Sequence, residues 1–183
     1  MTGNAAANRR RLVLIRHATP EPDFNRPPRE WPTSDQGIAE CCALAERLTD
    51  AGPTALYSSQ EPKAAATARE VAARLGIEWH TWPGLHEHER EALPEYAPAA
   101  WHALIRRLFE HPGELVMGLE TADQALARFS QAVESLLAET AADPLGIVSH
   151  GTVIALYVSL RTGEPAYDIW SRLGMADEIW VSL

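Results

Sequence analysis

The sequence predicts an α/β fold with three layers: a mostly parallel central sheet with helices on both faces. Short apolar runs rich in branched residues alternate along the chain with longer segments in which apolar residues recur every three or four positions. Glycine and proline residues separate these segments, as is typical of strands and helices joined by turns. Strands that alternate with helices usually pair in parallel and are covered on both sides. A chain of 183 residues without repeats or an evident linker is expected to form a single domain, residues 1–183.

The first part of the chain begins with an expected disordered tail over about residues 1–10. Residues 11–15 form a short branched run with polar neighbours, which predicts a buried strand. Five prolines between residues 18 and 32 predict a loop. Residues 34–49 carry apolar side chains at helical spacing, which predicts a helix with Thr33 or Ser34 as its cap and Gly-Pro after its end. Residues 55–57 predict a second strand.

The middle of the chain begins with an alanine-rich segment, residues 62–75. It has a proline in its first turn and a glycine after its end, which predicts a helix. Residues 77–81 predict a third strand, and residues 83–98 are polar, irregular and rich in His and Glu. Residues 99–109 predict a helix that a proline stops. The length of the segment 83–118 suggests a cap over a pocket.

The last part of the chain contains a helix over residues 121–139, where Thr and Gln form a capping-box pattern before an apolar stripe. Residues 145–149 predict a fourth strand, and residues 151–161 continue as a helix that a glycine ends. Residues 179–183 predict a terminal strand.

The composition excludes several classes of protein. Hydrophobic residues make up 46% and charged residues 22%, as in ordinary globular proteins, and the net charge of -9 argues against nucleic-acid binding. No apolar run approaches the roughly 18 residues that cross a bilayer, and the run at residues 12–15 is too short for a signal peptide. The adjacent Cys41 and Cys42 do not form a disulfide framework. We therefore expect free thiols and a cytoplasmic protein.

Two histidines follow predicted buried strands. His17 comes after the first strand, next to Arg16, and His150 comes after the fourth, 133 positions later. Because ligands bind at the carboxyl ends of strands in open α/β sheets, both imidazoles are expected to meet in one pocket. Two imidazoles and a permanent cation are suited to handling phosphate.

Three further segments complete a recognisable series with Arg16-His17-Ala18 and Ser149-His150-Gly151. These are Ser58 to Ala68, Leu85-His86-Glu87 and Gly118 to Thr121. In this order, over about residues 12–152, the series resembles the histidine phosphatase superfamily, also called phosphoglycerate mutase-like. The resemblance implies the phosphoglycerate mutase-like version of the predicted sandwich, with no cofactor and no metal.

The resemblance also exposes two departures. Lys63 stands where the family has its second phosphate-binding arginine, and Ala18 stands where it has glycine. A lysine supplies a point charge and not a bidentate fork, so we expect a slower or differently selective enzyme. The replacement also leaves open a non-catalytic member that only binds a phospho-ligand.

Phosphoester hydrolysis requires a nucleophile, donors for the phosphoryl oxygens and an acid for the leaving alkoxide. Neutral His17 is the expected nucleophile and forms a phosphohistidine. Arg16 offers a planar fork, His150 donates best as imidazolium, and amides after both histidines add donors if helices begin there. Glu87 is the expected proton donor, a role that requires a raised pKa, and Glu89 is its nearest substitute.

Plainer interpretations also fit some of these residues. Lys63 alone reads as a solvated helix lysine, and Glu87 lies in an acidic loop where exposed charges are usual. Glu120 belongs first to a helix cap, with a substrate role as a lesser alternative. His86 and His88, with His80 nearby, have a spacing that suits a transition metal. No second cluster of possible ligands accompanies them in the sequence. Three tryptophans fit a specificity pocket or the core equally well: Trp79, Trp82 and Trp101.

We therefore expect a metal-independent phosphatase that hydrolyses a small phosphorylated metabolite, with no nucleic-acid or membrane partner. His17, Glu87 and His150 are the expected catalytic residues, and Arg16, Lys63 and His150 the expected phosphate-binding residues. Only 23 residues separate Lys63 from Glu87, whereas the family's phosphoglycerate mutases generally carry longer insertions, so hydrolysis is favoured over mutase-type transfer. Substrate selection is expected from the loops at residues 20–32 and 83–118. The oligomeric state is not predicted.

Overall fold

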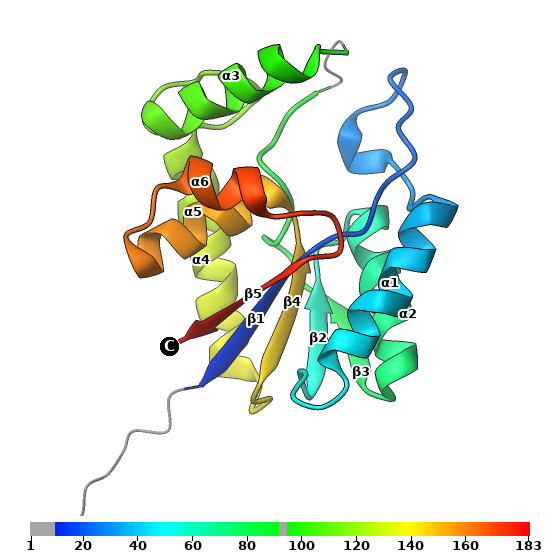
Figure 1. Cartoon of the computed structure of the whole chain (residues 1–183). Helices are drawn as coiled ribbons and strands as arrows, with labels where there is room; N and C mark the ends of the chain where they lie inside the picture. The colour runs from blue at the N-terminus through cyan, green and yellow to red at the C-terminus, as the bar shows by residue number, and fades with distance from the viewer. Residues whose placement is uncertain (1–9, 92–94) are drawn as a thin grey trace, which may run out of the picture.

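A computed structural model describes residues 10–91 and 95–183, so the predicted tail at residues 1–10 lies almost entirely outside the described residues. Five strands form one sheet in the order β3-β2-β4-β1-β5, and four of them are parallel (Figure 1). Only β5 runs antiparallel, beside β1. The strands are β1 (Arg11–Arg16), β2 (Ala55–Ser58), β3 (Glu78–Thr81), β4 (Leu145–Ser149) and β5 (Glu178–Ser182).

Six α-helices surround this sheet in the described ranges, together with one short 3-10 helix, η1 (Pro28–Glu30). The five predicted helices are present with ends within a residue or so of those expected. The α-helices are α1 (Asp35–Leu48), α2 (Pro62–Leu75), α3 (Pro98–Glu110), α4 (Ala122–Glu139), α5 (Gly151–Thr162) and α6 (Ala166–Arg172).

The alternation of side chains along β1 produces two hydrophobic cores. Leu12 and Leu14 pack with residues of α3 to α6, whereas Val13 and Ile15 pack with residues of α1 and α2. All four side chains are fully buried. Figure 1 shows α1 and α2 on one face of the sheet and α4 and α5 on the other. The predicted three-layer architecture is confirmed.

Local signals in the sequence set the helix ends. The Ser34 side chain accepts a hydrogen bond from the Gly37 amide at 3.1 Å, and the predicted capping box at Thr121 is complete. Gly76 and Gly163 end α2 and α5 in the left-handed conformation that favours glycine.

Two elements were not expected. The short helix α6 buries Ile169 and Trp170 but is too brief to show a clear period, and η1 lies in the loop predicted at residues 18–32. Both cysteines are free, and burial raises the pKa of Cys41 to about 11. No helix in the described ranges has the length and apolarity needed to cross a bilayer.

Candidate active site

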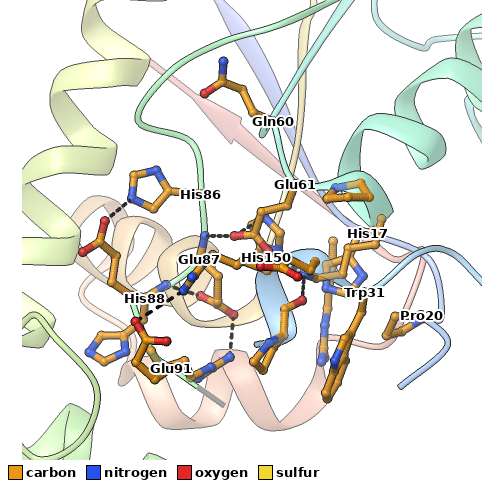
Figure 2. Close-up of a pocket in the computed structure, with 18 of the residues that line it drawn as sticks. His17, Pro20, Trp31, Gln60, Glu61, His86, Glu87, His88, Glu91 and His150 are labelled. Atoms are coloured by element: carbon orange, nitrogen blue, oxygen red, sulfur yellow. Dashed lines mark hydrogen bonds and ion pairs between the residues drawn. The ribbon is translucent and has the colours of Figure 1, made fainter. Parts of the chain in front are cut away.

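The two histidines meet at the carboxyl edge of the sheet. Strands β1 and β4 pair in parallel, with Arg16 opposite Ser149, and the His17 amide donates to the Ser149 carbonyl at 2.9 Å. The centroids of the His17 and His150 rings lie 5.0 Å apart, with the planes tilted by 60° (Figure 2). Both side chains are buried. The predicted meeting of these rings in one pocket is confirmed.

Backbone hydrogen bonds fix the position of His17. Its carbonyl accepts from the Ala176 amide at 3.2 Å, and the next amide, of Ala18, donates to Thr67 Oγ1 at 3.0 Å. The ring nitrogen Nδ1 lies 2.8 Å from the Ala18 carbonyl oxygen. Because a carbonyl only accepts, Nδ1 carries the proton and Nε2 keeps its lone pair. Burial, and then the proximity of His150 and Lys63, lowers the pKa of His17 well below its usual range, so the ring is neutral.

His150 lies directly before α5, and its ring is fully buried, with no hydrogen-bond partner for either nitrogen in the described part of the chain. Burial and then the nearby Lys63 lower the pKa of His150 well below its usual range. The expected imidazolium is therefore wrong for this state, because the ring has lost its hydration beside a cation. A helix begins after His150 but not after His17, where the Ala18 amide donates to Thr67 instead.

Arg16 projects from the end of β1 across the start of α5. Its Nη1 donates to the Leu173 carbonyl at 2.6 Å, whereas its Nε is buried without a partner. A Cβ on Gly151 would lie 3.2 Å from this Nε and 3.3 Å from Cζ. Glycine at the first position of α5 therefore allows the guanidinium to approach the helix closely.

The Glu87 carboxylate occupies the N-terminus of α5. It accepts from the amides of Thr152 and Val153 at 3.3 and 3.4 Å and from the His88 amide at 2.9 Å, and it faces Arg90 at 3.5 Å. Burial alone would raise the pKa of Glu87, but Arg90, then His150 and the hydrogen bond from the His88 amide, outweigh burial and lower it to about 2. The expected raised pKa is therefore wrong for this state.

Arg128 on α4 holds the loop that carries Glu87. Its guanidinium donates to the carbonyls of Gly84, His86 and Glu87 at 2.8 to 3.0 Å, and it pairs with Glu120 at 2.6 Å. Glu120 also accepts from the backbone amide of Glu89 at 2.9 Å. The observed contacts of Glu120 brace this loop, in place of the substrate role that was the lesser alternative.

Lys63 is buried, so its interpretation as a solvated helix lysine is wrong. Its ammonium donates to the Pro28 carbonyl at 2.6 Å and forms a close ion pair with Glu61. Glu61, which the sequence interpretation missed, also accepts from the Glu87 amide at 2.9 Å and lies 3.5 Å from His150 Nε2. Glu61 is the N-cap residue of α2, a position that favours Ser, Thr, Asp or Asn, and its side chain makes no cap bond.

These side chains line a cavity of about 650 Å³. Its wall includes Pro28 to Trp31 and His86 to Glu91, so both loops named from the sequence contribute. Arg90 was also missed. Only 12% of its side chain is exposed, and its guanidinium lies over the Trp101 ring at 5.1 Å.

Among the tryptophans and histidines noted in the sequence, His86 and His88 line the cavity. Trp79 packs against one hydrophobic core, and Trp82 and Trp101 pack against the other. A different tryptophan, Trp31, lines the cavity. His80 faces Glu78 and His86 faces Glu89, while His88 contacts the Glu120 carbonyl. Within residues 10–91 and 95–183, no three His, Cys, Asp or Glu side chains form a group able to hold a metal ion.

Comparison with known proteins agrees with this geometry. The family model of the histidine phosphatase superfamily (branch 1) matches residues 12–179. A glucosyl-3-phosphoglycerate phosphatase of Mycolicibacterium vanbaalenii is 30% identical over 194 aligned positions, which cover 95% of this chain and 84% of the relative.

Solved structures share the fold. A mycobacterial glucosyl-3-phosphoglycerate phosphatase superposes with a TM-score of 0.71 at 23% identity, covering 94% of this chain and 89% of that one. The alpha-ribazole phosphatase of Shigella flexneri superposes with a TM-score of 0.69 at 21% identity, with coverage of 94% and 89%. The chain therefore belongs to the histidine phosphatase superfamily, branch 1, and is a phosphatase of that type.

Proposed function

We propose that this phosphatase hydrolyses a small phosphorylated metabolite in the cytoplasm through a phosphohistidine on His17, without a metal ion. One observation carries the proposal. The neutral ring of His17, with Nε2 free, lies 5.0 Å from the ring of His150 on the wall of a 650 Å³ cavity. A nucleophile and a hydrogen-bond donor therefore face the same space.

Unpartnered donors support an oxyanion as the ligand. Arg16 Nε, Arg90 Nη1 and the His150 ring, which carries one N–H when neutral, are buried without a hydrogen-bond partner among residues 10–91 and 95–183. Leaving such groups unsatisfied is costly, and a phosphoryl group offers several strong acceptor oxygens. We assign Arg16, His150 and Lys63 to the phosphoryl group; Lys63 reaches a phosphoryl oxygen with its third N–H or by releasing Glu61 or the Pro28 carbonyl.

In the first step, the Nε2 lone pair of His17 forms an N–P bond while the P–O bond to the leaving group breaks. The leaving alkoxide takes a proton from the Glu87 carboxyl and departs as an alcohol. The lowered pKa leaves Glu87 ionised at neutral pH, so its proton must arrive with the substrate, whose negative charge raises the pKa of the nearby carboxyl.

In the second step, water attacks phosphorus and the Glu87 carboxylate takes its proton. The N–P bond breaks, inorganic phosphate is released, and neutral His17 is restored. The residues from 83 to 118 are proposed to act as a cap, because His86 to Glu91 form part of the cavity wall.

Hydrolysis of a generic aryl phosphate, with a chelator present, tests the proposal on the wild type and on His17→Ala. We expect chelator-resistant activity that His17→Ala abolishes, and a phosphoryl label on His17 after acid-free quenching. Phosphate binding without turnover, or activity that requires an added divalent metal, would contradict the proposal. Adding an alcohol acceptor separates hydrolysis from mutase-type transfer, since a mutase delivers the phosphoryl group to the alcohol.

A further inference from the structure

Glu61 is a buried carboxylate inside the proposed phosphoryl pocket, and the two hydrolytic steps give it no role. It lies between β2 and α2 with 9% of its side chain exposed. Its oxygens contact the Lys63 ammonium and the Glu87 amide, and one lies 3.5 Å from His150 Nε2 (Figure 2). The Glu61 carboxylate therefore lies beside Lys63 and His150, the same residues that are proposed to bind the phosphoryl oxygens.

Most cations around the cavity are already paired with a carboxylate. Five carboxylates and four Arg or Lys side chains line the cavity. Three of the four cations already face a carboxylate, in the pairs Lys63–Glu61, Arg90–Glu87 and Arg29–Glu91. Arg16 has no such partner among the described residues that line the cavity, and it is assigned to the phosphoryl group.

Binding of a phosphoryl group changes the surroundings of Glu61. Where a phosphoryl oxygen displaces Glu61 as a partner of the Lys63 ammonium, the Glu61 carboxylate loses its side-chain donor while it remains buried. A substrate hydroxyl or ammonium group near the ester oxygen would replace that donor. A substrate carboxylate at that place would instead meet a like charge with no free cation nearby.

We propose that Glu61 is a specificity-determining residue that selects phosphate monoesters carrying a hydroxyl or ammonium group close to the ester oxygen. It disfavours monoesters that carry a carboxylate there. The inference rests on the proposed function, since it takes the phosphoryl group to bind between His17, His150 and Lys63. Specificity of this kind arises from a repulsive contact as much as from an attractive one.

Three monoesters of similar size test the proposal: 2-hydroxyethyl, 2-aminoethyl and carboxymethyl phosphate. The measurement is kcat/KM for each on the wild type, Glu61→Gln and Glu30→Gln. Glutamine keeps the shape of Glu61 and removes its charge, and Glu30 is an exposed carboxylate of the same cavity wall. We expect the wild type to prefer the hydroxyl and ammonium esters by at least about tenfold. Glu61→Gln should lower that preference by about fivefold or more, and Glu30→Gln by less than about twofold.

An unchanged preference in Glu61→Gln, an equal loss in Glu30→Gln, or a wild-type preference for carboxymethyl phosphate would overturn the proposal. Dissociation constants of the three esters for His17→Ala and for His17→Ala with Glu61→Gln, by calorimetry, give the same comparison without turnover. Failure of the proposed function appears separately, as absent hydrolysis of the aryl phosphate by the wild type.

Discussion

The Glu87 carboxylate should make the stability of the fold depend on acidic pH in a way that one substitution removes. Its pKa falls from an ordinary value of 4.5 to about 2 because Arg90, His150 and the His88 amide outweigh burial. A group with a depressed pKa stabilises the folded state above its unfolded pKa, and this contribution is lost as the pH falls toward the folded pKa. The sign therefore predicts full stabilisation above about pH 5 and progressive loss toward pH 2.

The magnitude follows from the size of the pKa change. At about 1.4 kcal/mol per pKa unit, a drop from 4.5 to about 2 corresponds to roughly 3 kcal/mol at neutral pH. About 2 kcal/mol of this is lost by pH 3, where the unfolded chain binds the proton and the folded chain does so only in part.

The assay is urea unfolding between pH 3 and pH 7 for the wild type, Glu87→Gln and Glu89→Gln. The free-energy difference between the wild type and Glu87→Gln should be large at pH 7 and shrink by about 2 kcal/mol at pH 3. Glu89 is a suitable control because its side chain is 50% exposed and belongs to the same loop. A difference for Glu87→Gln that is independent of pH, or that Glu89→Gln reproduces, would refute the reasoning.

Three other substitutions test single contacts. Lys63→Arg should alter turnover or phosphate affinity by several-fold, because a fork replaces a point charge; unchanged steady-state kinetics would remove Lys63 from the site. Gly151→Ala should raise KM about tenfold or more and leave the melting temperature within a few degrees, because its Cβ crowds Arg16 at 3.2 Å; an unchanged KM would show that Arg16 does not bind the phosphoryl group. Arg128→Met should lower the free energy of unfolding by about 2 kcal/mol and reduce activity, because it leaves three loop carbonyls, including that of Glu87, without a donor; a variant as stable as the wild type in urea would contradict this bracing role.

The fold was predictable because its signals are local. The alanine-rich segment 62–75 carries a proline at its start and a glycine after its end, and α2 has those same bounds. The fully apolar run Leu12 to Ile15 is buried on both faces, as a central parallel strand must be. Helix α6 was missed because seven residues hold too few turns to reveal a helical period.

The site was predictable where a strand end fixes a side chain, and less so where partners come from several elements. His17 and His150 meet because β1 and β4 are neighbours in a parallel sheet. The environment of Glu87 depends on the start of α5 and on Arg90, which no local pattern places beside it. The same holds for Glu61, whose contact with His150 joins residues 89 positions apart.

A structure with bound vanadate tests the meeting of the two imidazoles at one phosphoryl group most directly. We predict vanadium bonded to, or in line with, His17 Nε2, with a His150 ring nitrogen and Arg16 within hydrogen-bond distance of the vanadate oxygens. Vanadate held elsewhere, or contacting only one of the two histidines, would contradict the proposed catalytic site.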